Sequence, residues 1–383
     1  MTGKMRLCIG AALVLTAGCV IAGLTRTRSI ESSKTWYGSG DAKAQETVAE
    51  DANEQEPEET WFDQEESEED FDFGLDEYWI DLNDLEYTVK DKLKCYLFIG
   101  TDHSGNEHAD DETYLGSMAD FLLLAILNKT ENTYGFIQFN RDTITDVIML
   151  DVDGEYQGVS EEQLCIAHWY GGSKQQSCIN TVDTVSDLLG GLDIDGYYAL
   201  SMDAIEQINH MLGGVTVTIE DDFSKVDPSL EMGKKIRLSD EQAVHYLQGR
   251  MNVGDGENES RMRRQRTYME AVYDRVIDQV KADKDLLEDF TDALGDKVTT
   301  NMNGEDFAQF RDLFRSGESC GIYVPEGESM LGTKLDDGLE HTEFYLDEES
   351  LEDIMVTLCG LEIDEFSDWD DLETETEFWE EYI

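Results

Sequence analysis

The pattern of apolar and polar positions divides the chain into unequal parts, and only residues 92–284 have the regular periodicity of a folded domain. Uninterrupted apolar runs predict buried strands at Cys95–Ile99, residues 119–128 and residues 134–139, and a further strand at residues 215–221. Segments with one apolar face predict helices at residues 179–191, 201–214, 238–250 and from Glu259 to about Lys284. Strands that alternate with helices indicate an α/β protein whose sheet is covered on both faces.

Polar residues and glycines mark the ends of these helices. Ser201 and Ser239 stand where an N-cap side chain accepts the first free backbone amides, and paired glycines follow the first two helices. We therefore expect Ser239 to be the N-cap of the helix that ends near Arg250.

The segments on either side of this domain are rich in acidic residues. Residues 29–91 hold too few apolar residues to fold alone and predict an acidic flexible linker, and residues 364–383 predict an acidic tail. Residues 285–363 are patterned more weakly, which predicts a small C-terminal extension. The aromatic residues scattered through the linker keep a partner-binding role open beside that of a spacer.

The N-terminus holds an uncharged apolar run, Leu7–Leu24, which follows Lys4 and Arg6 and is long enough to cross a bilayer as a helix. We expect residues 1–28 to form a cytoplasmic stub and one uncleaved transmembrane anchor, with the rest of the chain outside the cell. A cleaved signal peptide and a lipoprotein site at Cys19 are the alternatives that this segment leaves open.

The chain as a whole is strongly acidic, because 87 Asp and Glu against 28 Lys and Arg give a formal net charge of -59. A field of this sign repels nucleic acid and anionic membrane surfaces, so we exclude both as non-specific partners. An anionic ligand must then be held by a local basic site.

One stretch, "RMNVGDGENESRMRRQR", concentrates five arginines near the start of the last predicted helix. Arg261, Arg264 and Gln265 are three and four residues apart and therefore share one helix face. The glycine-rich loop before the helix brings Arg250 towards its start. Guanidinium groups beside a helix N-terminus predict a phosphate or pyrophosphate site. The other two arginines point elsewhere, and we expect them to pair with surface acids.

Polar groups also stand at the ends of the three buried strands. Asp102 follows the first strand, Asp120 begins the second and Arg141 follows the third, which predicts one shared sheet edge. Two carboxylates there can hold Mg²⁺, whose remaining positions go to phosphate oxygens and water. Metal and arginines together predict a phosphoryl-transfer site at which a hydroxyl attacks a neutralised pyrophosphate. Either Asp102 or Asp120 is then the acceptor of the hydroxyl proton.

The order of motifs between Lys94 and about Ile277 resembles the catalytic domain of the LytR-CpsA-Psr family: "FIGTD", "ADFLLLAILN", "FNRDT", "IAHWYGG", "NTVDTVSDLLG", "GGVTVTI", "EQAVHYLQGR" and "SRMRRQR". The resemblance implies a three-layer α/β/α fold with a mixed central sheet, here preceded by the predicted transmembrane helix and acidic linker. It implies a hydrophobic groove for a polyprenyl chain. The implied activity is Mg²⁺-dependent transfer of an anionic glycopolymer, of teichoic acid or capsule type, from polyprenyl pyrophosphate to peptidoglycan. The cell would be a Gram-positive bacterium.

The family motifs also imply roles for individual residues. Two residues match the metal-site aspartates: Asp102 and Asp120. Five residues match the catalytic positions, and their four arginines match the substrate-binding positions: Arg141, Arg250, Arg261, Arg264 and Gln265. Met118 and Gln248, however, stand where the family has two further arginines. These departures keep two alternatives open: a catalytically impaired polyprenyl-phosphate or cell-wall binding or regulatory protein, and a polyprenyl pyrophosphatase that uses water as acceptor.

The remaining candidates are one histidine and two cysteines. His168 follows an apolar stretch, and we interpret it as a structural or groove-lining residue, with a general base as the alternative. Cys165 and Cys178 either form a disulfide outside the cell or stay buried as free thiols.

Overall fold

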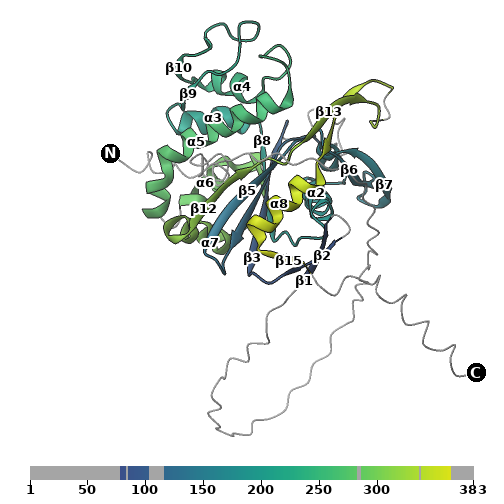
Figure 1. Ribbon diagram of the computed structural model, residues 1–383. Coiled ribbons are helices and arrows are strands. Elements are labelled where there is room, and N and C mark those ends of the chain that lie inside the picture. The colour runs from purple at the N-terminus through teal and green to yellow at the C-terminus, as the bar shows by residue number, and fades with distance from the viewer. Residues whose placement is uncertain (1–77, 83–84, 103–115, 283–285, 336–337, 364–383) are drawn as a thin grey trace, which may run out of the picture.

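The structure of the protein is a computed structural model, which describes residues 78–82, 85–102, 116–282, 286–335 and 338–363 (Figure 1). The transmembrane anchor predicted in residues 1–28, most of the acidic linker and the acidic tail lie outside these ranges. No helix within the described ranges is both long and apolar enough to cross a membrane.

The centre of the fold is a six-stranded mixed sheet. Its strands lie side by side in the order β11 (Val298–Thr300), β8 (Gly196–Ser201), β3 (Leu93–Thr101), β4 (Ala119–Asn128), β5 (Thr133–Phe139) and β12 (Glu318–Tyr323). Neighbouring strands are parallel at β3–β8 and β5–β12 and antiparallel at the other junctions. The mixed central sheet that the resemblance implies is therefore confirmed, and the strand predicted at residues 119–128 is β4 itself.

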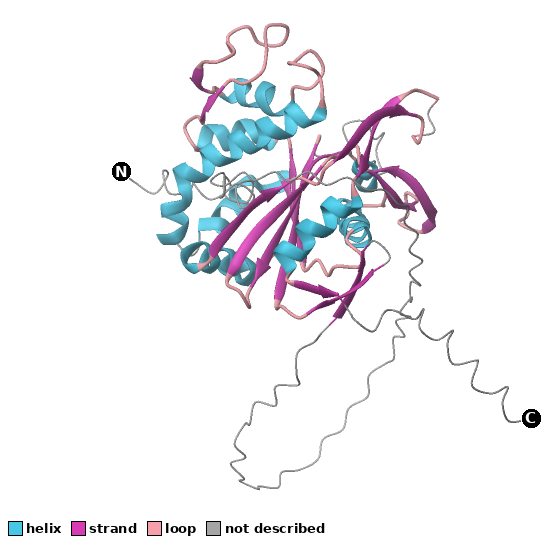
Figure 2. Cartoon of the chain, in the orientation of Figure 1, coloured by secondary structure: helices cyan, strands magenta, loops and turns pink. Residues whose placement is uncertain are grey.

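Helices cover both faces of this sheet (Figure 2). In β3, Tyr96 and Phe98 face one core whereas Leu97 and Ile99 face the other, because successive side chains of a strand point to opposite sides. The first core includes side chains of α3 (Ala204–Met211), α4 (Asp240–Gln248), α5 (Asn258–Ala282), α6 (Leu286–Leu294) and α7 (Gly304–Ser316). The second core includes side chains of α2 (Lys174–Leu188) and α8 (Glu348–Cys359). The α/β/α layering follows from this division.

Smaller strands and turns surround the central layers. Two-stranded pairs form between β6 (Ile144–Leu150) and β7 (Tyr156–Gln163), β9 (Thr216–Thr218) and β10 (Lys235–Arg237), and β13 (Gly327–Gly332) and β14 (His341–Leu346). A three-stranded sheet holds β1 (Tyr78–Leu82), β2 (Leu85–Val89) and β15 (Leu361–Ile363). The described residues also form two 3-10 helices, η3 (Leu164–Trp169) and η4 (Gly295–Lys297). The strand predicted at residues 215–221 is the short β9, which pairs with β10 and not with the central sheet.

The structure joins two flanking segments to the folded domain, against the predicted boundaries. Residues 285–363, predicted as a small extension, supply β11 and β12 at the two edges of the central sheet, and also α7 and α8. Residues 78–89, predicted as part of the linker, form β1 and β2. Edge strands are partly exposed and therefore carry fewer apolar residues than β3 or β4, which explains why their pattern is weak.

The predicted cap of α4 is confirmed. Ser239 Oγ accepts the amide of Gln242 at 3.2 Å, and the Gln242 side chain accepts the amide of Ser239 at 2.9 Å, which completes a capping box. Ser201 does not cap α3, whose N-cap residue is Asp203. The long helix α5 begins at Asn258, one residue before the predicted start.

Because α7 packs in the first core, a substitution in α7 tests whether residues 285–363 belong to the same folded domain. Phe310 is 2% exposed, and its ring centroid lies 5.0 Å from that of Tyr96 and 5.8 Å from that of Phe98. Phe310→Ala should lower the free energy of unfolding of the whole domain by about 3–5 kcal/mol in urea. Leu331→Ala, at a side chain that is 68% exposed, is the control and should change it by less than about 0.5 kcal/mol. A separate transition for residues 285–363 would contradict their inclusion in one core.

Candidate active site

Asp102 and Asp120 lie together at one edge of the central sheet. Because β3 and β4 are antiparallel, the end of β3 adjoins the start of β4, and the amide of Asp102 donates to the carbonyl of Met118 over 3.3 Å. Both carboxylates line an open space of about 870 Å³, the polar cleft, whose walls are Asp102, Asp120, Met202, Asp203, Glu206, Val244 and Gln248. The predicted shared edge for these two residues is confirmed.

A β-bulge at the start of β4 directs Asp120 into the cleft. Gly100 of β3 pairs with Phe121, and the next residue of β3 pairs with Ala119. Asp120 is therefore the extra residue of the bulge, and such bulges commonly redirect a side chain beside an active site. A Cβ atom on Gly100 would lie 2.8 Å from Cβ of Phe121, so glycine allows the close approach of these two strands.

Three arginines from separate segments converge on the same edge. Arg141, which follows β5, and Arg261, in the first turn of α5, both donate to Oδ1 of Asp120, the latter over 3.2 Å. Arg250, in the loop between α4 and α5, donates to Asp142 over 2.9 Å. The other carboxylate oxygen of Asp142 lies 3.4 Å from Nε of Arg141. The structure thus brings together three of the four arginines that the sequence predicts.

Burial and the positive charges of this cluster lower the pKa of Arg261, which is 4% exposed. Burial lowers the pKa of Arg261, Asp120 opposes that shift, and the neighbouring charges of Arg141 and Arg250 lower the pKa further. An anion bound between the guanidinium groups would relieve their mutual repulsion. The geometry therefore favours a ligand with several negatively charged oxygens.

Two asparagines hold the start of α5 against the end of β5. Asn258 Oδ1 accepts from both Nε and Nη2 of Arg261, at 3.1 and 2.7 Å. Its Nδ2 donates over 2.6 Å to Oδ1 of Asn140, which also accepts the amide of Asp142 at 3.0 Å. Neither Asn140 nor Asp142 is among the site residues predicted from the sequence. The signal was the polar run "FNRD" immediately after a buried strand.

Arg264 lies outside the cluster, although the sequence predicts it as a pyrophosphate ligand. Its side chain is 1% exposed, its Nε donates to the carbonyl of Tyr246 over 3.0 Å, and its terminal nitrogens bond to Asp221 and to the carbonyl of Gly249. Three residues along a helix leave a side chain about 60° away from the first one around the axis. Arg264 therefore faces α4 and ties the end of that helix to α5.

The other two arginines of the stretch differ from each other. Arg263 pairs with Glu220 and Asp221, as we expect of an arginine on an acidic surface. Arg266 donates to the side-chain oxygen of Gln138 over 2.5 Å, and its charge opposes the rise that burial causes in the pKa of Glu270.

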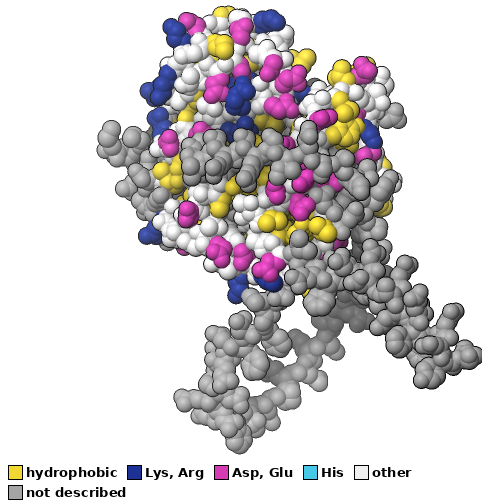
Figure 3. Space-filling model, in the orientation of Figure 1, with side chains coloured by type: hydrophobic (Ala, Val, Ile, Leu, Met, Phe, Trp, Pro, Cys, Tyr) yellow, Lys and Arg dark blue, Asp and Glu magenta, His cyan; other side chains and the backbone are white. Residues whose placement is uncertain are grey.

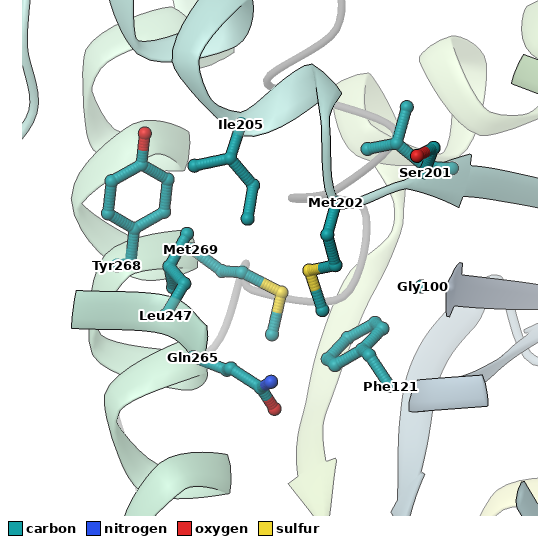
Figure 4. Close-up of a pocket in the computed structure, with 10 residues that line it drawn as sticks. Gly100, Phe121, Ser201, Met202, Ile205, Leu247, Gln265, Tyr268 and Met269 are labelled. Carbon is teal, nitrogen blue, oxygen red and sulfur yellow. The ribbon is translucent and has the colours of Figure 1, made fainter. Parts of the chain in front are cut away.

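A small apolar cavity adjoins the polar cleft, and Met202 lines both (Figure 4). Its walls come from the ends of β3, β4 and β8 and from three helices, with side chains that include Phe121, Met202, Ile205, Leu247 and Met269. Gln265, predicted as a site residue, projects towards this space (Figure 4). It is 4% exposed, and its Nε2 has no hydrogen-bond partner within the described part of the chain. A ligand with an apolar body and a polar end fits this arrangement.

His168 and the two neighbouring cysteines are structural. His168 is 3% exposed, and its Nδ1 lies 2.8 Å from the carbonyl oxygen of Ser117 while its Nε2 lies 3.7 Å from Sγ of Cys178. Burial lowers the pKa of His168 to about 4, which fits the structural interpretation and not a general base at neutral pH. Cys165 and Cys178 are free thiols, and burial raises the pKa of Cys165 to about 11 and of Cys178 to about 12.

The cleft offers part of a metal site. Within the described residues, no group of three or more His, Cys, Asp or Glu side chains surrounds a common metal position. Asp102 and Asp120 nevertheless line one cleft, and Mg²⁺ commonly takes one or two carboxylates and completes its shell with phosphate oxygens and water. The donor set therefore fits Mg²⁺ only together with a bound phosphate.

The comparisons with known proteins agree with this arrangement. A family model described as the LytR_cpsA_psr family matches residues 41–363. The chain belongs to the LytR-CpsA-Psr family. The resemblance carried by the eight motifs is thereby confirmed.

Individual LytR-CpsA-Psr relatives are distant in sequence. The chain is 25% identical over 219 residues to polyisoprenyl-teichoic acid--peptidoglycan teichoic acid transferase TagU of Halalkalibacterium halodurans, a match that spans 57% of this chain and 64% of that protein. The solved structure of protein gbs0355 of Streptococcus agalactiae has a TM-score of 0.56 at 20% identity, covering 74% of this chain and 96% of that one. TagV of B. subtilis has a TM-score of 0.49 at 20% identity, covering 70% and 96%. The likeness to gbs0355 shows the fold.

The two departures from the LytR-CpsA-Psr motifs both lie at the site. Sδ of Met118 lies 3.1 Å from Nη2 of Arg141, and Sγ of Cys165 lies 3.0 Å from the same nitrogen. Gln248 lines the polar cleft. Neutral side chains therefore occupy the places where the resemblance leads us to expect two more positive charges.

The low pKa of His168 predicts a pH dependence of stability. The pKa of this imidazole falls from 6.5 to about 4 on folding, so below pH 6.5 the unfolded chain takes up a proton that the folded protein does not. Between pH 7 and pH 4 the wild type should therefore lose about 3 kcal/mol more free energy of unfolding than His168→Gln. Urea unfolding at several pH values measures the difference. Equal losses in both proteins would show that His168 titrates normally.

Proposed function

We propose that this protein is a membrane-anchored phosphotransferase outside the cell that transfers an anionic glycopolymer from polyprenyl pyrophosphate to peptidoglycan. The observation that carries the proposal is the junction at Met202, where the polar cleft meets an apolar cavity. Asp120 in the cleft wall also accepts from Arg141 and Arg261, so the arginine cluster adjoins this junction. One ligand with a pyrophosphate head and an isoprenoid tail fits both spaces at once. Membership of the LytR-CpsA-Psr family and the teichoic acid transferase activity of the TagU relative support the same substrate class.

The charges of the cleft support a requirement for Mg²⁺. The lining of the cleft includes four carboxylates and no arginine: Asp102, Asp120, Asp203 and Glu206. Arg141 and Arg261 adjoin the cleft through their bonds to Asp120. Acidic and basic side chains are interspersed among the described residues of the face in Figure 3, without a continuous basic area. A pyrophosphate therefore needs further positive charge, which a divalent cation held by Asp102 and Asp120 supplies when it is bound.

The proposed reaction assigns a role to each group of side chains. Arg141, Arg250 and Arg261 bind the pyrophosphate oxygens and stabilise the charge that develops on them. The acceptor hydroxyl of peptidoglycan attacks the phosphorus that carries the glycopolymer, and the bridging P–O bond breaks so that polyprenyl phosphate leaves. Asp102 or Asp120 accepts the hydroxyl proton. The apolar cavity holds the first part of the isoprenoid chain throughout.

The proposed location rests on the N-terminal sequence and on the nature of the substrate. The apolar run Leu7–Leu24 would anchor the chain in the membrane of a Gram-positive bacterium, with residues 29–383 on the outer side. A lipid-linked donor resides in that membrane, and peptidoglycan lies just outside it. The anchor would therefore keep the cleft close to both substrates.

The second candidate function is that of a catalytically impaired protein that binds polyprenyl phosphate or the cell wall. Met118 and Gln248 favour it, because each replaces a charge that would neutralise the donor. Binding of donor without turnover is the result expected for this candidate. Hydrolysis with water as the only acceptor is the result expected for a pyrophosphatase.

Substitution of Arg261 tests the phosphotransferase. Arg261→Ala should lower kcat for release of polyprenyl phosphate by about a hundredfold to a thousandfold with Mg²⁺ present, because one buried cationic donor to the pyrophosphate is lost. Arg263→Ala, two residues away on the exposed side of the helix, is the matched control and should keep wild-type activity. The assay contains the full-length protein, a glycopolymer donor linked to polyprenyl pyrophosphate, and peptidoglycan as acceptor. Unchanged activity of Arg261→Ala would exclude the proposed site.

Narrowing the apolar cavity tests the binding of the lipid. Ile205→Phe should raise KM for a long polyprenyl donor by about tenfold, because the loss of roughly two buried CH₂ groups costs that much affinity. Binding of inorganic pyrophosphate with Mg²⁺, measured by calorimetry, should stay unchanged. Met251→Phe, at a side chain that is 75% exposed, is the control. An equal effect on both ligands would indicate a general distortion and not a lipid site.

A further inference from the structure

Asp142 is a buried carboxylate between two arginines of the cluster beside the cleft. Its side chain is 2% exposed, and its two oxygens face different guanidinium groups. Oδ2 accepts from Nη2 of Arg250 over 2.9 Å, and Oδ1 lies 3.4 Å from Nε of Arg141. Neither Asp142 nor the two arginines line the polar cleft, but Arg141 also donates to Asp120, which does. Asp142 is therefore connected to the cleft through Arg141.

The backbone and neighbours of Asp142 hold it in place. Its amide donates to Asn140 at 3.0 Å, and its carbonyl accepts the amide of Phe344 in β14 at 2.8 Å. Gln163, at the end of β7, points Nε2 at Oδ1 of Asp142 over 3.5 Å and donates to the carbonyl of Thr342 over 2.5 Å. Strand β14 thus holds the backbone of Asp142, which gives residues 285–363 a structural link to the arginines.

We propose that Asp142 is a positioning residue that fixes Arg141 and Arg250 relative to each other, so that both guanidinium groups meet the pyrophosphate in the geometry of the transition state. The inference rests on the proposed function. Long arginine side chains lose considerable rotamer entropy when they are ordered, and a buried carboxylate that orders them in advance removes this cost from the reaction. Asp142 need not touch the substrate for this role.

Binding and catalysis should respond differently to the loss of this carboxylate. Its negative charge opposes the binding of an anion nearby, so its removal makes the site more positive. The ground state of bound pyrophosphate tolerates some displacement of the guanidinium groups. The transition state does not, because a misplacement of about 1 Å can cost about a hundredfold in rate. A residue that merely stabilises the fold would affect both alike.

The chain contains a matched control for Asp142. Asp221 also lies between two arginines, at 2.7 Å from Arg263 and bonded to Arg264, and its side chain is 10% exposed. This second pair ties α5 to α4 and does not face the polar cleft. Asp142→Asn and Asp221→Asn therefore remove the same charge from the same kind of contact, one at the cleft and one away from it.

The experiment compares both variants and Asp142→Glu with the wild-type full-length chain. Asp142→Asn should lower kcat for release of polyprenyl phosphate by about tenfold to a hundredfold, while calorimetry shows equal or tighter binding of inorganic pyrophosphate with Mg²⁺. Asp142→Glu keeps the charge and should recover part of kcat. Asp221→Asn should lower the Tm but leave kcat unchanged. Wild-type kcat in Asp142→Asn, or a parallel loss of kcat, binding and Tm, would overturn the inference.

A measurement that does not depend on catalysis tests the positioning role of Asp142 independently of the proposed function. The NMR order parameters of the Nε–H groups should fall for Arg141 and Arg250 in Asp142→Asn, whereas in Asp221→Asn those of Arg263 and Arg264 should fall. If the wild type turns over no donor but this pattern appears, the proposed function fails and the positioning role stands. If the wild type is active and the arginines of Asp142→Asn stay ordered, the positioning role fails.

Discussion

Buried positive charge is the constraint on which this structure depends. Arg141 and Arg261 are withdrawn from water at the end of the central sheet, and isolated guanidinium groups would be costly there. Asp120 on β4 and Asp142 after β5 compensate them, and the β-bulge at the start of β4 sets the direction of the first of these carboxylates. The arginines are therefore held by the scaffold before any ligand arrives, and an incoming anion competes with carboxylates that are already in place.

The same constraint explains why segments far apart in sequence are needed at one place. The cluster takes one side chain from the end of β5, one from the loop after α4 and one from the first turn of α5. Asn140 and Asn258 join these segments through direct hydrogen bonds, and Phe344 connects them to β14. The C-terminal residues thus belong to the domain that carries the site, since they close the sheet edges and support the polar cluster.

The acidic charge of the chain also limits how it can bind an anionic ligand. A chain with a net charge of -59 does not attract a polyanion through its overall field, and carboxylates outnumber arginines even within the polar cleft. Affinity for the proposed donor must then come from short-range contacts with the arginines, from a divalent cation and from burial of the lipid. The apolar cavity beside the cleft offers the last of these, and Gln265 offers a polar group on its wall. Neutral side chains at Met118 and Gln248 make these contributions more important here.

The sequence by itself determined the α/β class, the position of β4, the cap of α4 and the family, because these depend on local periodicity, capping residues and motif order. It also indicated most of the cluster. Only the tertiary structure decided that Arg264 faces α4. Residues that share a helix face can still point in directions far apart, and the packing of α4 against α5 determines that Arg264 contacts the carbonyl of Tyr246. Only the tertiary structure showed that Asp142 lies between two arginines and that residues 285–363 contribute strands to the central sheet. Long-range pairing of partly exposed edge strands leaves little trace in the local pattern.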